Sequence, residues 1–205
     1  MASRTIIASG VSKSYAWTGG RIGWAVFPTV AEAHVFKNLN INYISCTSAY
    51  NQFGAKVAIE SPLSPLWMER MCAAFQERRN FMVTGLNKIP GITCRNPRGA
   101  FYLFPNIADV CMKLGVITAH ARMPESARQR TSPATMFQMF LLWRHRIATM
   151  DRRSFGRIGS EGEHYLRLSI ATALNDLKIA LEQIRIAVND EDGFQDFVRV
   201  GQHLW

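Results

Sequence analysis

Residues 9–23 read Ser-Gly-Val-Ser-Lys-Ser-Tyr-Ala-Trp-Thr-Gly-Gly-Arg-Ile-Gly, and this stretch decides how the chain is interpreted. Lys13 stands among small residues, and Arg21 follows after two glycines. A lysine amine is a nucleophile only when it is deprotonated, and an arginine grips a phosphate at two points with its planar fork. Small neighbours let a ligand approach the backbone, and the glycines permit a tight turn. These residue types suit a reactive lysine beside an anion-binding turn.

The stretch resembles the pyridoxal-phosphate lysine signature of the class I/II (fold-type I) aminotransferases, the aspartate aminotransferase-like group. That signature reads roughly S-x-x-[SA]-K-x-[FY]-x-M-x-G-x-R-x-G. The resemblance implies that Lys13 is the Schiff-base lysine and that Arg21 binds the phosphate of the cofactor, pyridoxal 5'-phosphate. Trp17 stands where the family usually has methionine. Gly10 stands where some members have a phosphate-binding serine, which leaves Ser12 as the candidate for that contact.

Two later segments carry the same resemblance. Residues 99–105, Gly-Ala-Phe-Tyr-Leu-Phe-Pro, are similar to a strand of the family's small domain. Residues 154–156 and 165–171 are similar to its S-x-F-G … Y-[VL]-R-[LI]-[SC] segment. Side chains alternate between the two faces of a strand, so Arg167 is turned away from the apolar residues on either side of it. In the family the matching arginine binds the substrate's α-carboxylate, and the resemblance implies that role for Arg167.

The resemblance implies an α/β chain that forms the C-terminal part of the fold-type I fold: the end of the large-domain sheet plus the α+β small domain. We expect residues 1–61 to belong to the large cofactor-binding domain and residues 62–205 to form the small domain with a long linking helix. Ser64 is a candidate N-cap of that helix, because a proline follows it. The apolar runs at residues 4–8 and 22–27 look like buried strands of a covered sheet.

Helical patterns and turn signals place the remaining elements. Thr29 and Glu32 form a capping-box pair, and Thr172 or Asn175 is the expected cap of the last helix. The long helix carries an apolar stripe, including Cys72, that is expected to be core. Helices are predicted over residues 29–40, 48–61, 64–87, 107–114, 135–146 and 175–188, and the further strands over 92–95, 100–104, 147–150 and 165–171.

The composition limits the classes of function. The net charge is +9, from 24 basic and 15 acidic residues, which raises the question of nucleic acid. No nucleic-acid motif accompanies the densest cluster, so we favour a solvated face or a site for anionic substrate and cofactor. That cluster consists of Arg144, Arg146, Arg152, Arg153 and Arg157.

Membrane, metal and disulfide functions are not expected. The chain has no run of eighteen apolar residues, and its start lacks the apolar core of a signal peptide. Its four cysteines show no C-x-x-C pair and are interpreted as reduced, mostly buried thiols of a cytoplasmic protein. The five histidines form no H-x-x-x-H pair.

The resemblance covers residues 4–188 but only the second half of a complete enzyme. The first half supplies a phosphate-binding turn, a ring that stacks on the pyridine, an asparagine and an Asp-x-x-Tyr. None of these can be placed here, and Asp-x-x-Tyr does not occur. The aspartate matters because a protonated ring nitrogen makes the cofactor an electron sink. We therefore expect the 205-residue chain to be inactive alone, with exposed apolar surface that favours self-association.

Three functions are compatible with these residues. The first is transamination between an amino acid and a 2-oxo acid, with Lys13 also moving the proton at the substrate's Cα and a homodimer as the implied assembly. The second is a β-lyase or a related fold-type I enzyme, such as a cyclopropane-forming synthase, which shares the lysine and the carboxylate-binding arginine. The third is a non-catalytic, aminotransferase-like module.

Overall fold

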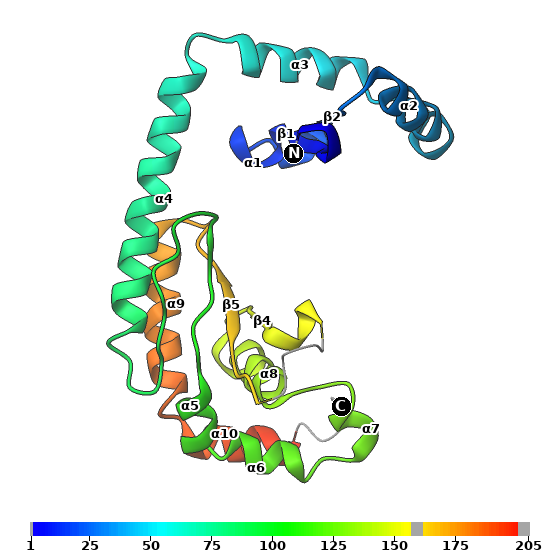
Figure 1. Cartoon of the computed structure of the whole chain (residues 1–205). Helices are drawn as coiled ribbons and strands as arrows, with labels where there is room; N and C mark the ends of the chain where they lie inside the picture. The colour runs from blue at the N-terminus through cyan, green and yellow to red at the C-terminus, as the bar shows by residue number, and fades with distance from the viewer. Residues whose placement is uncertain (1, 157–161, 201–205) are drawn as a thin grey trace. The chain divides into compact units, whose positions relative to one another are not determined.

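The computed structural model describes residues 2–156 and 162–200, in two compact units, Met1–Cys72 and Ala73–Trp205 (Figure 1). Helix α4 (Ser64–Leu86) crosses the boundary between the two units. Within the described residues, no helix is both long enough and apolar enough to cross a bilayer.

The first unit contains a β-hairpin around the lysine. Strands β1 (Ile7–Gly10) and β2 (Gly23–Val26) pair antiparallel, with Ile7 opposite Val26 and Gly10 opposite Gly23. The prediction of strands in this region is confirmed, but the prediction that they are buried is wrong. Most of their residues are exposed, because a two-stranded ladder covers little surface.

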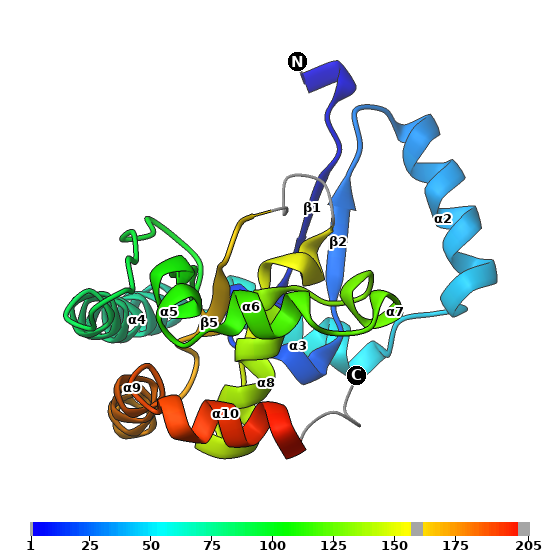
Figure 2. The same cartoon turned by 90° about the horizontal axis from the view of Figure 1, so that it is seen from below.

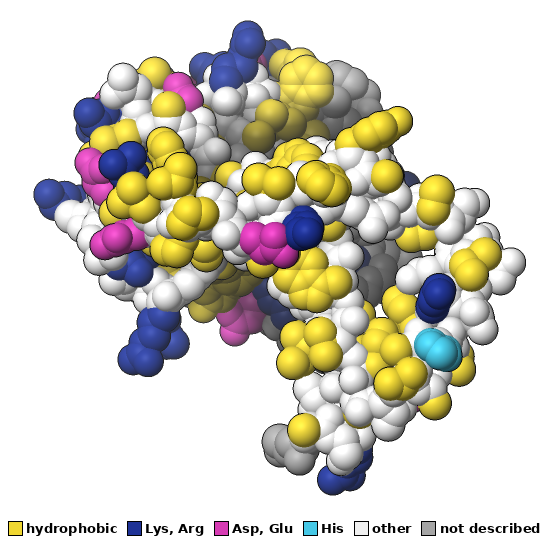
Figure 3. All heavy atoms as spheres, turned by 90° about the horizontal axis from the view of Figure 1, so that it is seen from above, with side chains coloured by type: hydrophobic (Ala, Val, Ile, Leu, Met, Phe, Trp, Pro, Cys, Tyr) yellow, Lys and Arg dark blue, Asp and Glu magenta, His cyan; other side chains and the backbone are white. Residues whose placement is uncertain are grey.

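Two helices follow the hairpin, α2 (Val30–Ile44) and α3 (Ala49–Glu60). The capping box between Thr29 and Glu32 is present, as predicted. Helix α2 has no buried residue. Among the described residues, eighteen of the twenty-seven exposed large hydrophobic side chains lie in this unit, and Figure 3 shows hydrophobic side chains exposed on the face that it draws. The expectation of exposed apolar surface is therefore confirmed.

A tryptophan joins the hairpin to α3. The rim of the Trp17 ring is so close to Gly54 of α3 that a Cβ there would lie 2.5 Å from its Cη2 atom. A Cβ on Gly20 would lie 2.6 Å from the same ring. Asn51 Nδ2 donates a hydrogen bond of 2.9 Å to the Gly20 carbonyl oxygen. Helix α3 thereby braces the loop that carries the lysine, over a small buried cluster of Val11, Ile22 and Ala55.

The second unit is built on a three-stranded antiparallel sheet. Strands β3 (Tyr102–Leu103), β4 (Met150–Asp151) and β5 (Leu166–Ser169) lie in the order β3-β5-β4. The predicted alternation on β5 is confirmed, since Leu166 and Leu168 are buried while Ser169 is exposed. The strand predicted at residues 92–95 is reduced to an isolated bridge between Thr93 and Asn106.

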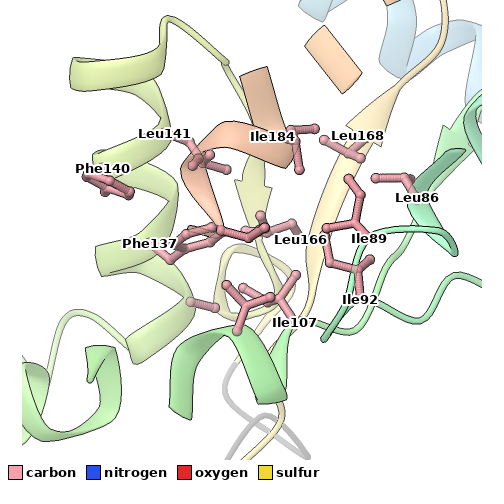
Figure 4. Packing of buried hydrophobic residues seen from close by; sticks show 14 of the residues in the cluster. Leu86, Ile89, Ile92, Ile107, Phe137, Phe140, Leu141, Leu166, Leu168 and Ile184 are labelled. Carbon is pink, nitrogen blue, oxygen red and sulfur yellow. The ribbon is translucent and has the colours of Figure 1, made fainter. Parts of the chain in front are cut away.

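Helices pack on the inner face of this sheet, as Figures 2 and 4 show. The core contains Leu86 of α4, Ile107, Phe137 and Leu141 of α8, and Ile184 of α9. The helices of this unit beyond α4 are α5 (Ala108–Lys113), α6 (Val116–Ala121), α7 (Glu125–Arg128), α8 (Pro133–His145), α9 (Leu174–Ala187) and α10 (Glu191–Val200). Residues 118–135, which had no predicted structure, contain α7 and parts of α6 and α8.

Two predicted helix caps are wrong. Ser64 is the first residue of α4 rather than its cap, and its hydroxyl donates to the Ala58 carbonyl oxygen. At the start of α9 no side chain caps the backbone; the Thr172 hydroxyl instead donates to Asp176 Oδ2 over 2.7 Å. Both hydroxyls find a nearby acceptor that competes with capping.

Two of the four cysteines are buried and two are exposed. Cys94 and Cys111 are buried, and burial raises the pKa of the Cys111 thiol to about 12. Cys46 and Cys72 are exposed, so the prediction of mostly buried thiols holds for half of them and the predicted core position of Cys72 is wrong. All four are free thiols, as expected.

The segment after residue 188, which had no predicted role, forms α10 and packs against α8. Phe194 is fully buried, and its ring meets the Phe140 ring of α8 edge-on at 5.3 Å between centroids. Asp190 accepts a hydrogen bond from the Gly193 N–H at 3.0 Å and one from Arg144 Nε at 2.9 Å. This helix therefore belongs to the core of the second unit.

We expect the free energy of unfolding to depend on pH, because three histidines are half-buried or buried. Burial lowers the pKa of His120, His145 and His164 below the ordinary value of 6.5. These histidines therefore bind protons more tightly in the unfolded chain than in the folded one. The free energy of unfolding has its full value, as far as these histidines are concerned, above pH 6.5, and it decreases as the pH falls through the lowered folded pKa values. Urea unfolding should give a smaller free energy at about pH 5.5 than at about pH 7.5.

His145→Gln should reduce this difference, whereas His34→Gln, on an exposed position of α2, should leave it unchanged. An equal pH dependence in the wild type and His145→Gln would contradict the burial argument.

The Trp17 contacts predict that Gly54→Ala destabilises the first unit. Alanine favours a helix by about 1 kcal/mol over glycine, but the added Cβ collides with a rigid ring, and overpacking costs about 1–3 kcal/mol. Hydrogen exchange at the Val11 amide, which donates to the Ile22 carbonyl oxygen at 3.2 Å, reports on the loop. Gly19→Ala is the matched control, because nothing lies within 4 Å of its Cβ position. Faster exchange is expected only in Gly54→Ala; equal protection in both variants would refute the brace.

Candidate functional site

The lysine loop, residues 11–22, connects β1 to β2. It contains a short helix α1 (Val11–Ser14), which carries the lysine, and a 3-10 turn η2 (Thr18–Gly20). Because β1 and β2 are antiparallel, the loop leaves and re-enters the ladder at the Gly10–Gly23 pair. Lys13 and Arg21 therefore lie at the same end of the hairpin.

Close backbone contacts define the shape of the lysine loop. A Cβ on Gly10 would lie 2.8 Å from the Ile22 carbonyl oxygen, so glycine is needed where some relatives of the signature have serine. Arg21 adopts a left-handed backbone conformation with φ 51°. Its Nη1 donates a hydrogen bond of 2.9 Å to the Thr18 carbonyl oxygen. The arginine is therefore tied to the turn that precedes it, and part of its fork is already oriented.

The predicted site residues of the lysine loop differ in burial. Ser12 is half-buried, whereas Lys13 and Arg21 are exposed; Ser14, which was not predicted as a site residue, is also exposed. The hydroxyls of Ser12 and Ser14 and the guanidinium of Arg21 lie in this loop, and these types of donor suit a phosphate. The close approach at Gly10 leaves no room for a side chain at that position.

The predicted carboxylate-binding arginine lies in the second unit, on the central strand β5. The centre of its guanidinium, Arg167 Cζ, lies 4.3 Å from the Tyr102 ring centroid and 5.0 Å from that of Phe155. Its Nη2 donates to Met150 Sδ at 2.6 Å. A thioether is a weak acceptor, and no ion pair involves Arg167 among the residues that the structure describes. The half-buried guanidinium is thus oriented by aromatic rings.

Asp151 positions Phe155 beside this arginine. Asp151 is only 3% exposed and accepts a hydrogen bond of 2.9 Å from the Ser154 N–H, which caps the 3-10 helix η3 (Arg152–Phe155). The Thr135 hydroxyl of α8 also donates to Asp151. The buried carboxylate therefore fixes the turn that ends at Phe155.

Sequence reasoning missed Tyr102 and Phe155 as neighbours of Arg167, and Asp151 as the residue that fixes the turn carrying Phe155. Tyr102 and Phe155 stand in the two motifs quoted for the family, which could have drawn attention to them. Their approach to Arg167 depends on the pairing of β3 and β4 with β5, and strand register cannot be read from such short strands.

The outer face of the sheet carries further rings and an open cleft. The Phe104 and Tyr165 rings stack at 5.2 Å between centroids, and Phe104 meets Phe155 edge-on at 6.2 Å. A cleft of about 660 Å³ opens beside them. Its lining residues are Thr93, Arg95, Pro97, Tyr102, Phe104, Asn106, Arg152, Glu163 and Tyr165.

Three described arginines of the basic cluster have different surroundings. Arg144 pairs with Asp190 at 2.9 Å, and Arg153 Nη1 donates to the Thr131 carbonyl oxygen at 2.8 Å. Arg152 lines the cleft, and Arg157 lies outside the described residues. The described residues also contain no group of acidic, histidine or cysteine side chains that could hold a metal ion.

The chain matches a known protein family over most of its length. The chain matches the family described as "Aminotransferase class I and II" over residues 1–184. The lysine loop, β5 and most of α9 lie inside the matched region, whereas α10 lies beyond it.

The curated relatives include aspartate aminotransferases from bacteria. The chain is 35% identical over 184 residues to that of Rhizobium meliloti, with 90% of this chain and 40% of the relative covered. It is 33% identical over 183 residues to that of Geobacillus stearothermophilus, with 89% and 40% covered. The chain therefore spans about two fifths of the length of these relatives.

Solved structures show the same partial coverage. The aspartate aminotransferase of Rhizobium meliloti superposes with a TM-score of 0.72 at 32% identity, covering 92% of this chain and 42% of that one. An aromatic aminotransferase of Pyrococcus horikoshii gives a TM-score of 0.74 at 26% identity, covering 94% and 45%. The fold is thus that of a part of an aminotransferase, and the chain belongs to the class I and II aminotransferase family.

Proposed function

We propose that this chain carries the reactive lysine and the carboxylate-binding arginine of a pyridoxal-phosphate-dependent aminotransferase that exchanges an amino acid with a 2-oxo acid. The observation that carries the proposal is the lysine loop. Its antiparallel ends bring Lys13 and Arg21 to one end of a hairpin, and Ser12 precedes Lys13 in the same short helix. A homodimer and a cytoplasmic location are part of the same proposal and follow from the family alone.

The phosphate of the cofactor would be held by Arg21 and Ser12. Arg21 already donates to the Thr18 carbonyl oxygen through Nη1, and a guanidinium has further donors for a phosphate. When bound, the cofactor supplies the electron sink that allows a proton to leave the substrate's Cα. The residues of the lysine loop supply the anchor for the phosphate and the amine beside it.

Lys13 has two roles in this proposal, as the residue that joins the cofactor and as the base at the substrate's Cα. Both roles require a neutral amine, which enzymes obtain by burial or by nearby positive charge. Lys13 is exposed here, and Arg21 is the nearby cation that the lysine loop itself offers. The loop is therefore formed, while the burial that a complete site requires is not provided by these residues.

Arg167 would bind the substrate's α-carboxylate. The rings of Tyr102 and Phe155 face its guanidinium at 4.3 and 5.0 Å, and such rings restrict the plane of an arginine by cation–π contact. A carboxylate that replaces the Met150 thioether would exchange a weak acceptor for a charged one with matching two-point geometry.

The lysine assignment predicts the site of covalent labelling. The chain is incubated with pyridoxal phosphate and reduced with borohydride, and the labelled peptides are mapped. Label is expected on Lys13 ahead of the other lysines, because only Lys13 has Arg21 and Ser12 beside it to hold the phosphate. Arg21→Gln should lower this preference. Label on Lys37, Lys56 or Lys178 with none on Lys13 would contradict the assignment.

The arginine assignment predicts a large effect of Arg167→Lys in a catalytically complete form of the protein. Lysine keeps the charge but loses the two-point fork, and a charged hydrogen bond contributes about 1.5–3 kcal/mol, or about ten- to a hundred-fold in kcat/KM. The defect should appear with every α-amino acid and should leave cofactor retention unchanged. The matched control is Arg146→Lys, at an exposed arginine. Loss of cofactor with unchanged substrate affinity would contradict the assignment.

A further inference from the structure

Helix α10 forms one wall of a cavity in the second unit, which we call the α10 cavity. It has a volume of about 700 Å³ and is lined by residues of α6, α8, α10 and the turn between α6 and α7. Helices α6 and α10 both contact α8, and Figure 2 shows the three beside one another. The volume is within the range of small-molecule sites, about 300–1,000 Å³. Helix α10 lies beyond residues 1–184, so the match to the aminotransferase family gives this cavity no role.

Buried side chains hold the walls of the α10 cavity in place. Phe194 and Phe197 anchor α10 in the core, and the residues that follow each of them, Gln195 and Val198, line the cavity. Met136 lines it from α8 and is only 1% exposed. The cavity is therefore formed by the core of the second unit, and a ligand does not have to order a segment of chain to bind there.

The more deeply buried lining of the α10 cavity is apolar. Met136 is buried, and Met123 and Val198 are half-buried. Methionine sulfur makes favourable contacts with aromatic rings, at about 5 Å and often at the ring edge. Two methionines around one cavity therefore favour an aromatic ring over a saturated chain as the apolar part of a ligand.

The exposed lining of the α10 cavity is polar and positively charged. Thr118 and Arg122 are four residues apart at the end of α6 and share one of its faces, and Gln195 lines the cavity from α10. Arg122 is the one ionisable side chain among the lining residues that the structure describes. Within the described part of the chain, none of these three side chains has a hydrogen-bonding or ionic partner. A guanidinium binds a carboxylate at two points, and a hydroxyl and an amide can donate to the same group.

We propose that the α10 cavity binds an aromatic monocarboxylate, with its ring in contact with Met123 and Met136 and its carboxylate bound by Arg122. The cavity shares no lining residue with the cleft beside Arg167. The proposal therefore does not depend on the proposed function, and either one can be refuted without the other.

Methyl NMR tests the proposal on the 205-residue chain itself. The methionine Cε methyls are labelled with 13C, and the chain is titrated with 4-phenylbutyrate, the neutral 4-phenylbutan-1-ol and octanoate. The phenyl ring current of 4-phenylbutyrate should shift the Met123 and Met136 methyl signals. This acid should bind about tenfold more tightly than the alcohol, the factor expected for one charged hydrogen bond. It should also bind more tightly than octanoate, because octanoate lacks the ring for the sulfur contacts.

Variants of Arg122 test the contact with the carboxylate. Arg122→Gln should remove the preference for the acid over the alcohol, while both compounds still shift the Met136 signal. Arg122→Lys keeps the charge but loses the two-point fork, so it should keep part of the preference. Arg185→Gln, at an exposed arginine of α9 outside the cavity, is the matched control and should leave both affinities unchanged. The methyl signals of each variant must stay as dispersed as those of the wild type.

Several results would refute the site in the α10 cavity. One is the absence of shifts at Met123 and Met136. Another is equal affinity for the acid and the alcohol in the wild type, or an unchanged preference in Arg122→Gln. Binding of octanoate as tight as that of 4-phenylbutyrate would refute the aromatic class of ligand.

The Met150 methyl separates this site from the one at Arg167. Its sulfur accepts a hydrogen bond from Arg167 Nη2, so its signal reports on binding beside that arginine. A shift confined to Met150 would support the carboxylate site of the proposed function and refute the site in the α10 cavity.

Discussion

The alternation of side chains along β5 is the constraint on which the second unit depends. Leu166 and Leu168 enter the core from one face of the strand, so Arg167 between them must project from the other. Strands β3 and β4 pair with β5 on both sides and prevent a shift in register, which would exchange the two faces. The position of the arginine is therefore fixed by the hydrophobic core behind it, while Tyr102 and Phe155 fix the orientation of its fork.

The lysine loop is held by different means. Backbone contacts close it at the hairpin, and Trp17 joins it to α3 through the close approaches at Gly20 and Gly54. Few side chains of the first unit are buried, whereas the second unit has an extensive core that includes α10. Local geometry thus forms the lysine loop, but the first unit leaves much apolar surface exposed. That surface is a physical reason to expect self-association or a further polypeptide against it.

The sequence predicted what depends on local pattern. The spacing of Lys13 and Arg21 gave the family resemblance, the Thr29 capping box gave the start of α2, and the alternation around Arg167 gave its direction. These features need only neighbours in the chain, and the family match and the strands bear them out. The exposure of β1 and β2 could not be predicted in this way, because burial depends on what packs against a strand.

The neighbours of Arg167 could not be predicted from the sequence for a related reason. Tyr102 is 65 positions away in the chain, and its contact with Arg167 exists only through the register of β3 on β5. The capping role of Asp151 likewise depends on a 3-10 turn that the sequence motif did not reveal. Helix α10 has a broad apolar face, but its partner Phe140 lies on α8, far from it in the chain. The functional roles of Lys13 and Arg167 stay proposals that the geometry supports.

The phosphorus resonance of pyridoxal phosphate offers the most direct measurement of the central claim, that the lysine loop binds the cofactor's phosphate. The resonance is recorded by 31P NMR with the wild-type chain and with Arg21→Gln and Arg185→Gln. The account predicts a shifted, broadened resonance with the wild type and with Arg185→Gln, and a resonance close to that of the free cofactor with Arg21→Gln. The same shift in all three proteins would contradict the account, because the phosphate would then be bound elsewhere.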